Sequence, residues 1–145
     1  MSGSLAILAL TTVAVLVIDQ SMKLLLHRIR FKRLSLGPFG SLRLGDGQLW
    51  VHRLGEGTSR ALWLWVLPAG VLIVGSAWIP ASRAFVGLVL GGSLSNATEA
   101  ALRGSVTDYV CLRFWPAFNV ADVAIAAGAI GIAIELIRVI GGTAT

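Results

Sequence analysis

Apolar residues along this chain gather into long runs separated by more polar segments. The runs cover residues 5–26, 61–78, 84–102 and 120–140. A helix needs about 20 mostly apolar residues to cross a bilayer, and each run approaches or exceeds that length. The pattern therefore predicts an all-α membrane protein with four transmembrane helices and with both termini on one side of the membrane.

The segment between the first two runs has a different pattern. Residues 27–60 are rich in glycine and alternate apolar with polar residues over short stretches, as in Leu42-Arg43-Leu44 and Leu49-Trp50-Val51-His52. Such alternation between glycines is typical of short strands and turns. We expect a small extramembrane β-rich element here and a loop over residues 103–119 on the same side. We find no tandem repeat or low-complexity linker, so residues 1–145 are predicted to form a single domain.

Composition supports a membrane protein. Hydrophobic residues make up 56% of the chain and charged residues only 13%, whereas about a quarter of a soluble domain is charged. The net charge of +5 resides mostly between the apolar runs, which favours lipid headgroups over nucleic acid as partners. The first run is expected to remain as a helix rather than to be a cleaved signal peptide, because nothing basic precedes it.

The single cysteine limits other chemistry. Cys111 cannot form an intramolecular disulfide, and it lacks His or Cys neighbours at the spacing of zinc ligands. No metal site is predicted, and Cys111 is interpreted as an ordinary packed side chain.

Charged residues inside or beside the apolar runs occur at helical spacing. Asn96, Glu99 and Arg103 share one helix face with Gly92, and such a polar face must look into the bundle or a wet cavity. Three ion pairs are predicted: Asp19 with Lys23, Glu99 with Arg103, and Glu135 with Arg138. Taken alone, each pair is more simply structural than catalytic.

Two aspartates, Asp108 and Asp122, bracket a short aromatic loop and are candidates for chemistry. Asn119 can cap the last helix, which places Asp122 in the first turn, where the helix dipole favours a negative charge. Asp108 follows Gly104, and burial would favour its protonated form. Two acids in such environments can share one proton and act as general acid and base on a water molecule. The alternative is that both acids only cap helices or form ion pairs.

These residues resemble a known family, the lipoprotein signal peptidases, or signal peptidase II. The resemblance rests on Gly91-Gly92-Ser93-Leu94-Ser95-Asn96, Glu99, Gly104, Val106, Asp108-Tyr109, Phe118-Asn119-Val120-Ala121-Asp122, Ile125, and Asp19-Gln20 with Lys23. It implies a four-helix aspartyl endopeptidase that spans the bacterial cytoplasmic (inner) membrane several times. Such an enzyme removes the signal peptide of a prolipoprotein just before its diacylglyceryl-modified cysteine.

The resemblance also implies roles for individual residues. Asp108 and Asp122 would be the catalytic pair, and segment 27–60 would be the family's extramembrane cradle. The residues that would shape the site or bind substrate are Asp19, Lys23, Asn96, Glu99, Arg103 and Asn119. A lipidated prolipoprotein or lipopeptide and membrane lipids would be the partners, and no cofactor or metal is implied.

Some positions depart from the family pattern and leave an alternative open. The family's Asp-Arg after the asparagine is Glu99-Ala100 here, so Arg103, one turn on, is the candidate to replace the missing arginine. The family's Asn-x-Gly motif is at best Gly55-Glu56-Gly57, without the asparagine. The alternative is a non-catalytic accessory subunit that binds lipid, lipopeptide or a partner membrane protein. A proton-coupled transporter is disfavoured by the lack of an inverted repeat.

The distribution of basic residues opposes the orientation that the resemblance implies. Of the 12 Lys and Arg residues, Lys23 lies in the first run, Arg83 and Arg138 lie on the side of the termini, and the others fall in segments 27–60 and 103–119. The positive-inside rule would place these two segments in the cytoplasm. A signal peptidase needs them outside, and we adopt that orientation, with the basic residues binding anionic lipid.

Overall fold

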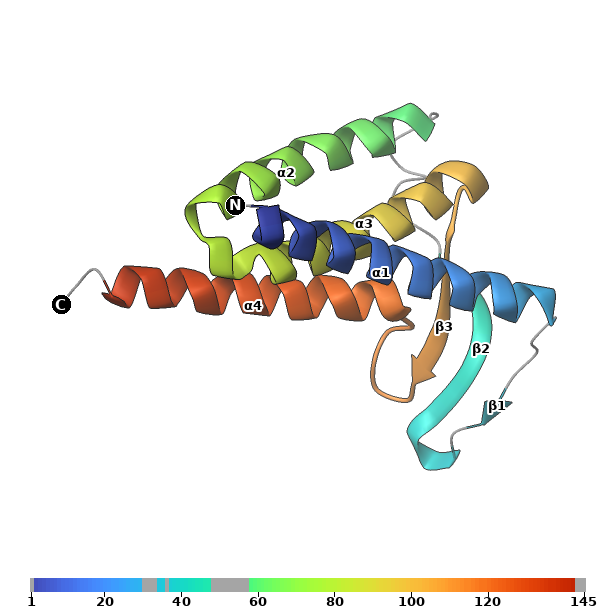
Figure 1. The fold of residues 1–145 in the computed structure, drawn as a ribbon. Helices are drawn as coiled ribbons and strands as arrows, with labels where there is room; N and C mark the ends of the chain where they lie inside the picture. The colour runs from blue at the N-terminus through green and yellow to red at the C-terminus, as the bar shows by residue number, and fades with distance from the viewer. Residues whose placement is uncertain (1, 30–33, 36, 48–57, 143–145) are drawn as a thin grey trace.

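The computed structural model describes residues 2–29, 34–35, 37–47 and 58–142. The elements in chain order are α1 (Ser2–Arg28), β1 (Leu34–Ser35), the 3-10 turn η1 (Gly37–Phe39), β2 (Gly40–Gly47), α2 (Thr58–Trp78), η3 (Pro80–Ser82), α3 (Arg83–Arg103), β3 (Val106–Leu112) and α4 (Val120–Gly142). Figure 1 shows the helices running alternately in opposite directions, with the strands at one end and the first turns of α1 and last turns of α4 at the other.

Each predicted apolar run coincides with one of the described helices. Two of these helices are long and apolar enough to cross a membrane, over Leu5–Arg28 and Val120–Gly142, and α2 has a shorter apolar stretch, Trp65–Trp78. α3 is more polar because it carries the Asn96 and Glu99 side chains. A central helix can carry such residues, since its neighbours separate them from lipid.

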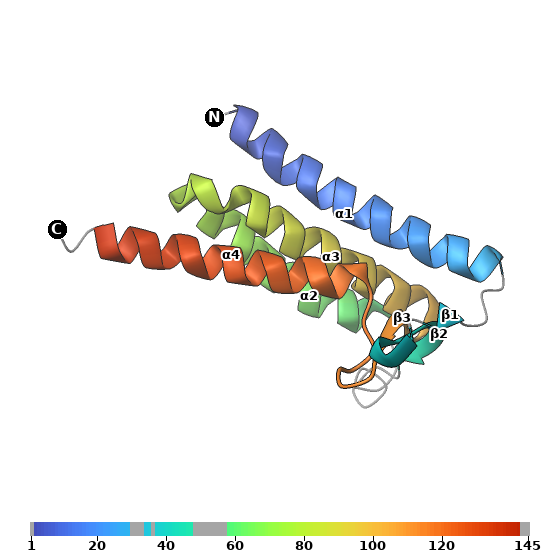
Figure 2. The same cartoon turned by 90° about the horizontal axis from the view of Figure 1, so that it is seen from below.

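α3 lies at the centre of the bundle. It packs against α1, α2 and α4, and Figure 2 shows it between α1 and α4. Two adjacent glycines permit this approach: a Cβ on Gly91 would lie 2.5 Å from the Thr12 carbonyl oxygen of α1, and one on Gly92 would lie 2.5 Å from the Ala121 carbonyl oxygen of α4. Small residues are the usual means of bringing helix backbones together in lipid. This packing brings polar side chains of three helices to one place.

A three-stranded antiparallel sheet in the order β1-β2-β3 covers one end of the bundle. β1 and β2 fall within the predicted β-rich segment, whereas the predicted strand at residues 49–52 lies outside the described residues. β3 occupies part of the 103–119 segment that the sequence predicted to be a loop, so that prediction was wrong for residues 106–112. β3 is formed by pairing with β2, in which Asp108 lies opposite Gly45.

The chain reverses on both sides of β3. Gly104 ends α3 in the left-handed conformation, with φ of 71°, and donates its N–H to the Ala100 carbonyl at 2.9 Å. After β3 the chain folds back, so that Val110 and Phe118 exchange backbone hydrogen bonds of 2.9 and 3.0 Å. This return sets the residue after Phe118, at the start of α4, beside the middle of β3.

Candidate functional site

The start of α4 fixes Asp122, one of the two candidate aspartates. Asn119 caps the helix by accepting the Asp122 backbone N–H at 2.9 Å, and Asp122 accepts the Asn119 backbone N–H at 3.0 Å. This reciprocal arrangement satisfies N–H groups that a helix start leaves without partners. The Val120 N–H donates to the Tyr109 hydroxyl of β3 at 3.1 Å. The cap predicted from the sequence is confirmed.

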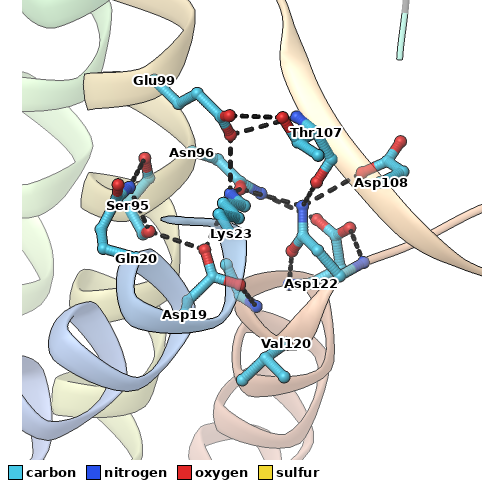
Figure 3. Close-up of polar contacts among 12 residues, drawn as sticks. Asp19, Gln20, Lys23, Ser95, Asn96, Glu99, Thr107, Asp108, Val120 and Asp122 are labelled. Carbon is cyan, nitrogen blue, oxygen red and sulfur yellow. Dashed lines mark hydrogen bonds and ion pairs between the residues drawn. The ribbon is translucent and has the colours of Figure 1, made fainter. Parts of the chain in front are cut away.

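Asn119 also binds Asp108, the other candidate aspartate. Its side-chain amide donates to Asp108 at 3.0 Å and to the Asn96 side-chain oxygen at 3.1 Å, and Asn96 in turn donates to Asp122 at 2.9 Å. The two aspartates come from different elements, β3 and α4 (Figure 3). They nevertheless share Asn119 as a hydrogen-bond partner. Both are partly exposed, whereas Asn119 is fully buried.

A buried lysine lies behind the aspartates. Lys23 of α1 is 1% exposed and forms ion pairs with Asp19 at 2.7 Å and with Glu99 at 2.9 Å. Its ammonium also donates to the Asn96 side-chain oxygen at 2.9 Å. Asp19 accepts the Ala121 backbone N–H of α4 at 3.1 Å, so its carboxylate joins α1 to α4. Ion pairs in a dry interior require such additional hydrogen bonds to offset the loss of hydration.

Glu99 joins α3 to the strand that carries Asp108. Its carboxylate accepts both the backbone N–H of Thr107, at 3.0 Å, and the Thr107 hydroxyl, at 2.5 Å. Arg103, whose side chain is 44% exposed, also forms an ion pair with Glu99, from Nη1 to Oε1 at 3.3 Å. Within the described part of the chain, Lys23 rather than Arg103 is therefore the cation nearest the asparagines.

The electrostatics distinguish Asp108 from the other acids. Burial, together with the nearby negative charge of Asp122, raises the pKa of the Asp108 carboxyl from 3.8 to about 6, and the hydrogen bond from Asn119 opposes this rise. Asp108 therefore retains a proton closer to neutral pH than an ordinary aspartate. Both oxygens of Asp122, by contrast, accept N–H donors.

The structure brings all the sequence-predicted site residues into one continuous network. Sequence reasoning missed the direct role of several of its members: Gln20, Ser95, Thr107 and Tyr109. If a strand had been predicted over Val106–Leu112, Thr107 and Asp108 would have been expected to point to its opposite faces.

The predicted ion pair of Glu135 and Arg138 also forms, at 2.6 Å, but elsewhere on α4. Among the described residues, no group of three or more His, Cys, Asp or Glu side chains could hold a metal ion.

Fold and site together define a class of protein. Many large apolar side chains on α1, α2 and α4 are exposed, while charged side chains are buried between the helices. This reverses the distribution of a soluble protein and is that of a helical membrane protein. Its polar centre, with two accessible aspartates, has the residues of an acid–base site.

Comparison with known proteins shows the family. The model of the signal peptidase (SPase) II family matches residues 11–138, and the chain belongs to this family of membrane-bound bacterial peptidases. A lipoprotein signal peptidase of Methylorubrum extorquens (strain PA1) is 31% identical over 94% of this chain and 86% of its own length. A lipoprotein signal peptidase of Mycobacterium avium (strain 104) is 33% identical over 60% of this chain and 57% of its own length.

A solved structure of a bacterial membrane enzyme is similar to the whole fold. It aligns with a TM-score of 0.77 over 90% of this chain and 92% of that chain, at 19% sequence identity. At this identity the likeness supports the fold alone.

Proposed function

We propose that this protein is a membrane aspartyl endopeptidase that removes signal peptides from lipidated prolipoproteins, with Asp108 and Asp122 as its catalytic pair. The observation that carries the proposal is the position of these two acids. They are partly exposed and bonded to the same asparagine, whereas the other acids of the network are buried in ion pairs. Membership of the signal peptidase II family supports the reaction.

The different surroundings of the two aspartates suggest how they divide the work. Asp108 holds the shared proton, and Asp122 takes a proton from a water molecule as the water oxygen attacks the scissile carbonyl carbon. Asp108 gives its proton to the carbonyl oxygen. When the tetrahedral intermediate collapses, the peptide C–N bond breaks, the leaving nitrogen takes the proton from Asp122, and Asp108 recovers its own. The pair titrates as a unit, so the protons belong to the dyad.

The remaining network residues would support this chemistry without reacting. Asn96 and Asn119 orient the two carboxylates through hydrogen bonds, and Lys23 lies directly behind Asn96. Asp19 and Glu99 balance the charge of Lys23, and Arg103 forms a further ion pair with Glu99.

For the membrane arrangement we infer four spans, α1 to α4, in the bacterial cytoplasmic membrane and a single domain over residues 1–145. The active site would lie at the outer surface beneath the sheet. The exposed apolar side chains of α1 and α4 suit contact with lipid tails. A lipidated substrate would reach the aspartates laterally, because its acyl chains remain in the bilayer.

Purified protein reconstituted in lipid provides the test. A prolipoprotein carrying a diacylglyceryl cysteine should be cleaved just before that cysteine, and mass spectrometry would identify both products. The same precursor without lipid should be cleaved far more slowly. Absence of cleavage of the lipidated precursor in a folded preparation would favour the accessory-subunit alternative.

A further inference from the structure

The residue directly before Asp108 is buried and bonded twice to a side chain of α3. Thr107 is 2% exposed and gives both its backbone N–H and its hydroxyl proton to the Glu99 carboxylate. Hydrogen bonds to a charged acceptor are about twice as strong as neutral ones. Glu99 thus binds β3 at one residue through two bonds.

The bonds to Thr107 belong to the network that also contacts Asp122. Glu99 is fixed by Lys23 at 2.9 Å, Lys23 by Asn96 at 2.9 Å, and Asn96 donates to Asp122 at 2.9 Å. Successive side chains of a strand point to opposite faces, so fixing Thr107 on one face also fixes the direction of Asp108 on the other. In Figure 3, Thr107 points toward Glu99, and Asp108 leaves the same strand next to it.

A third contact restrains Thr107 from α1. His27 Nε2 lies 3.2 Å from the Thr107 hydroxyl oxygen. The hydroxyl has one proton, which it gives to Glu99, so it can only accept from His27. A hydrogen bond here therefore requires a proton on His27 Nε2, and side chains of both α1 and α3 contact this single side chain of β3.

We propose that Glu99 and Thr107 are positioning residues for Asp108: the two-bond contact fixes β3 against α3 and thereby sets where the Asp108 carboxyl lies relative to Asp122. The inference rests on the proposed function, because Asp108 needs this placement only if it reacts. Glu99 replaces an aspartate of the family pattern, and its additional methylene group gives its carboxylate a longer reach from α3 toward β3.

Three variants separate positioning from general stability. Thr107→Val keeps the shape and the backbone N–H but removes the hydroxyl bond, whereas Thr107→Ser keeps the bond. Thr12→Val makes the same chemical change on α1, where the hydroxyl donates to the Leu8 carbonyl of its own helix, at 2.8 Å. Each variant is compared per amount of folded protein, in the lipid used for the wild type.

Turnover should respond to the loss of the hydroxyl alone. Thr107→Val should lower kcat roughly tenfold with KM nearly unchanged, since a displaced reacting group costs rate rather than binding. As the pH rises, its kcat should begin to decline at a lower pH than that of the wild type. The reason is that Asp108 would be further from Asp122, whose negative charge helps Asp108 to keep its proton. Thr107→Ser and Thr12→Val should behave as wild type. A Thr107→Val enzyme with wild-type kcat and pH profile would overturn the proposal.

Hydrogen exchange of the backbone amides of β3 provides a measurement that needs no turnover. Exchange should accelerate in Thr107→Val and in Glu99→Asp, which keeps the charge but shortens the side chain, and should be unchanged in Thr12→Val. Unchanged exchange in both site variants would overturn the positioning role even in an active enzyme. Failure of the wild type to cleave a lipidated precursor would instead overturn the proposed function, and exchange would still show whether Glu99 fixes the strand.

Discussion

Lys23 is the residue on which the buried charges of the site depend. It is nearly inaccessible and lies within 2.9 Å of two carboxylates, Asp19 and Glu99, which are themselves buried. A buried carboxylate without its counter-ion costs several kcal/mol, so the two acids are tolerated because the lysine is present. The lysine is therefore part of the fold as well as of the site.

Replacing Lys23 by methionine should be strongly destabilising. Lys23→Met keeps most of the volume but leaves Asp19 without its cation and Glu99 with the more distant, partly exposed Arg103, which we expect to cost about 3 to 5 kcal/mol. Arg138→Met is the matched control, because the Arg138 side chain is 69% exposed and its ion pair with Glu135 should contribute at most about 1 kcal/mol. Unfolding in a common detergent measures both. Equal losses for the two variants would contradict this account of the lysine.

Asp108 should make stability depend on pH in a defined direction. Because folding raises the pKa of Asp108 from 3.8 to about 6, the folded protein binds this proton more tightly than the unfolded chain does. The resulting stabilisation is complete below the unfolded pKa and is lost as the pH rises through about 6. Asp108→Asn cannot ionise, so its melting temperature relative to wild type should increase from about pH 4 to about pH 8. A difference that is constant or falls over this range would contradict the raised pKa.

Among the elements, α3 determines how closely the others approach. Gly92 faces the Ala121 carbonyl oxygen, so an added methyl group would meet backbone rather than a flexible side chain. The affected turn of α4 is the one that carries Asp122. Packing of α3 against α4 is therefore coupled to the geometry of the site.

Gly92→Ala should destabilise the protein by about 1 to 3 kcal/mol, as overpacking usually does, and should reduce cleavage. Gly75→Ala on α2 is its control, because a Cβ there would meet nothing within 4 Å. That variant should be neutral or up to about 1 kcal/mol more stable, since alanine is the better helix former. Thermal unfolding of the two variants is the measurement. A Gly92→Ala protein as stable as Gly75→Ala would show that the approach of Gly92 to the Ala121 carbonyl does not limit packing.

The sequence predicted the helices more completely than the sheet. Long apolar runs identify helices directly, and α1 to α4 lie within a few residues of their predicted bounds. β3 was missed because it depends on pairing with β2, which is distant along the chain. The same reason explains the site: Asp108, Asn119 and Asp122 follow from local patterns and the family resemblance, but the contact of Thr107 with Glu99 arises only on folding.

At the scale of the whole molecule, the orientation in the membrane remains a prediction. The sheet and the first turn of α4, which carry the two aspartates, lie at the end of the bundle opposite the exposed end of α4 (Figure 1). A peptidase acting on exported lipoproteins requires the sheet end to face outward, although the basic segments favour the reverse.

Cysteine labelling of intact cells tests this orientation. With Cys111 replaced by serine, Ser35→Cys on exposed β1 should react with a membrane-impermeant maleimide from outside. Gly141→Cys, at the exposed end of α4, should react only after the membrane is opened. The opposite pattern would place the aspartates in the cytoplasm and remove the peptidase function.

The central claim is that Asp108 and Asp122 together catalyse peptide hydrolysis. Asp108→Asn and Asp122→Asn each remove an ionisable group with little change in volume, so each should reduce cleavage of a lipidated prolipoprotein by at least about 10³-fold while the bundle stays folded. Glu135→Gln, an equivalent change in an ion pair outside the network, should cleave at the wild-type rate. The direct measurement is the single-turnover cleavage rate of the four proteins in the same lipid. Loss of cleavage in the two aspartate variants alone is the predicted result, and equal rates in all four proteins would contradict the account.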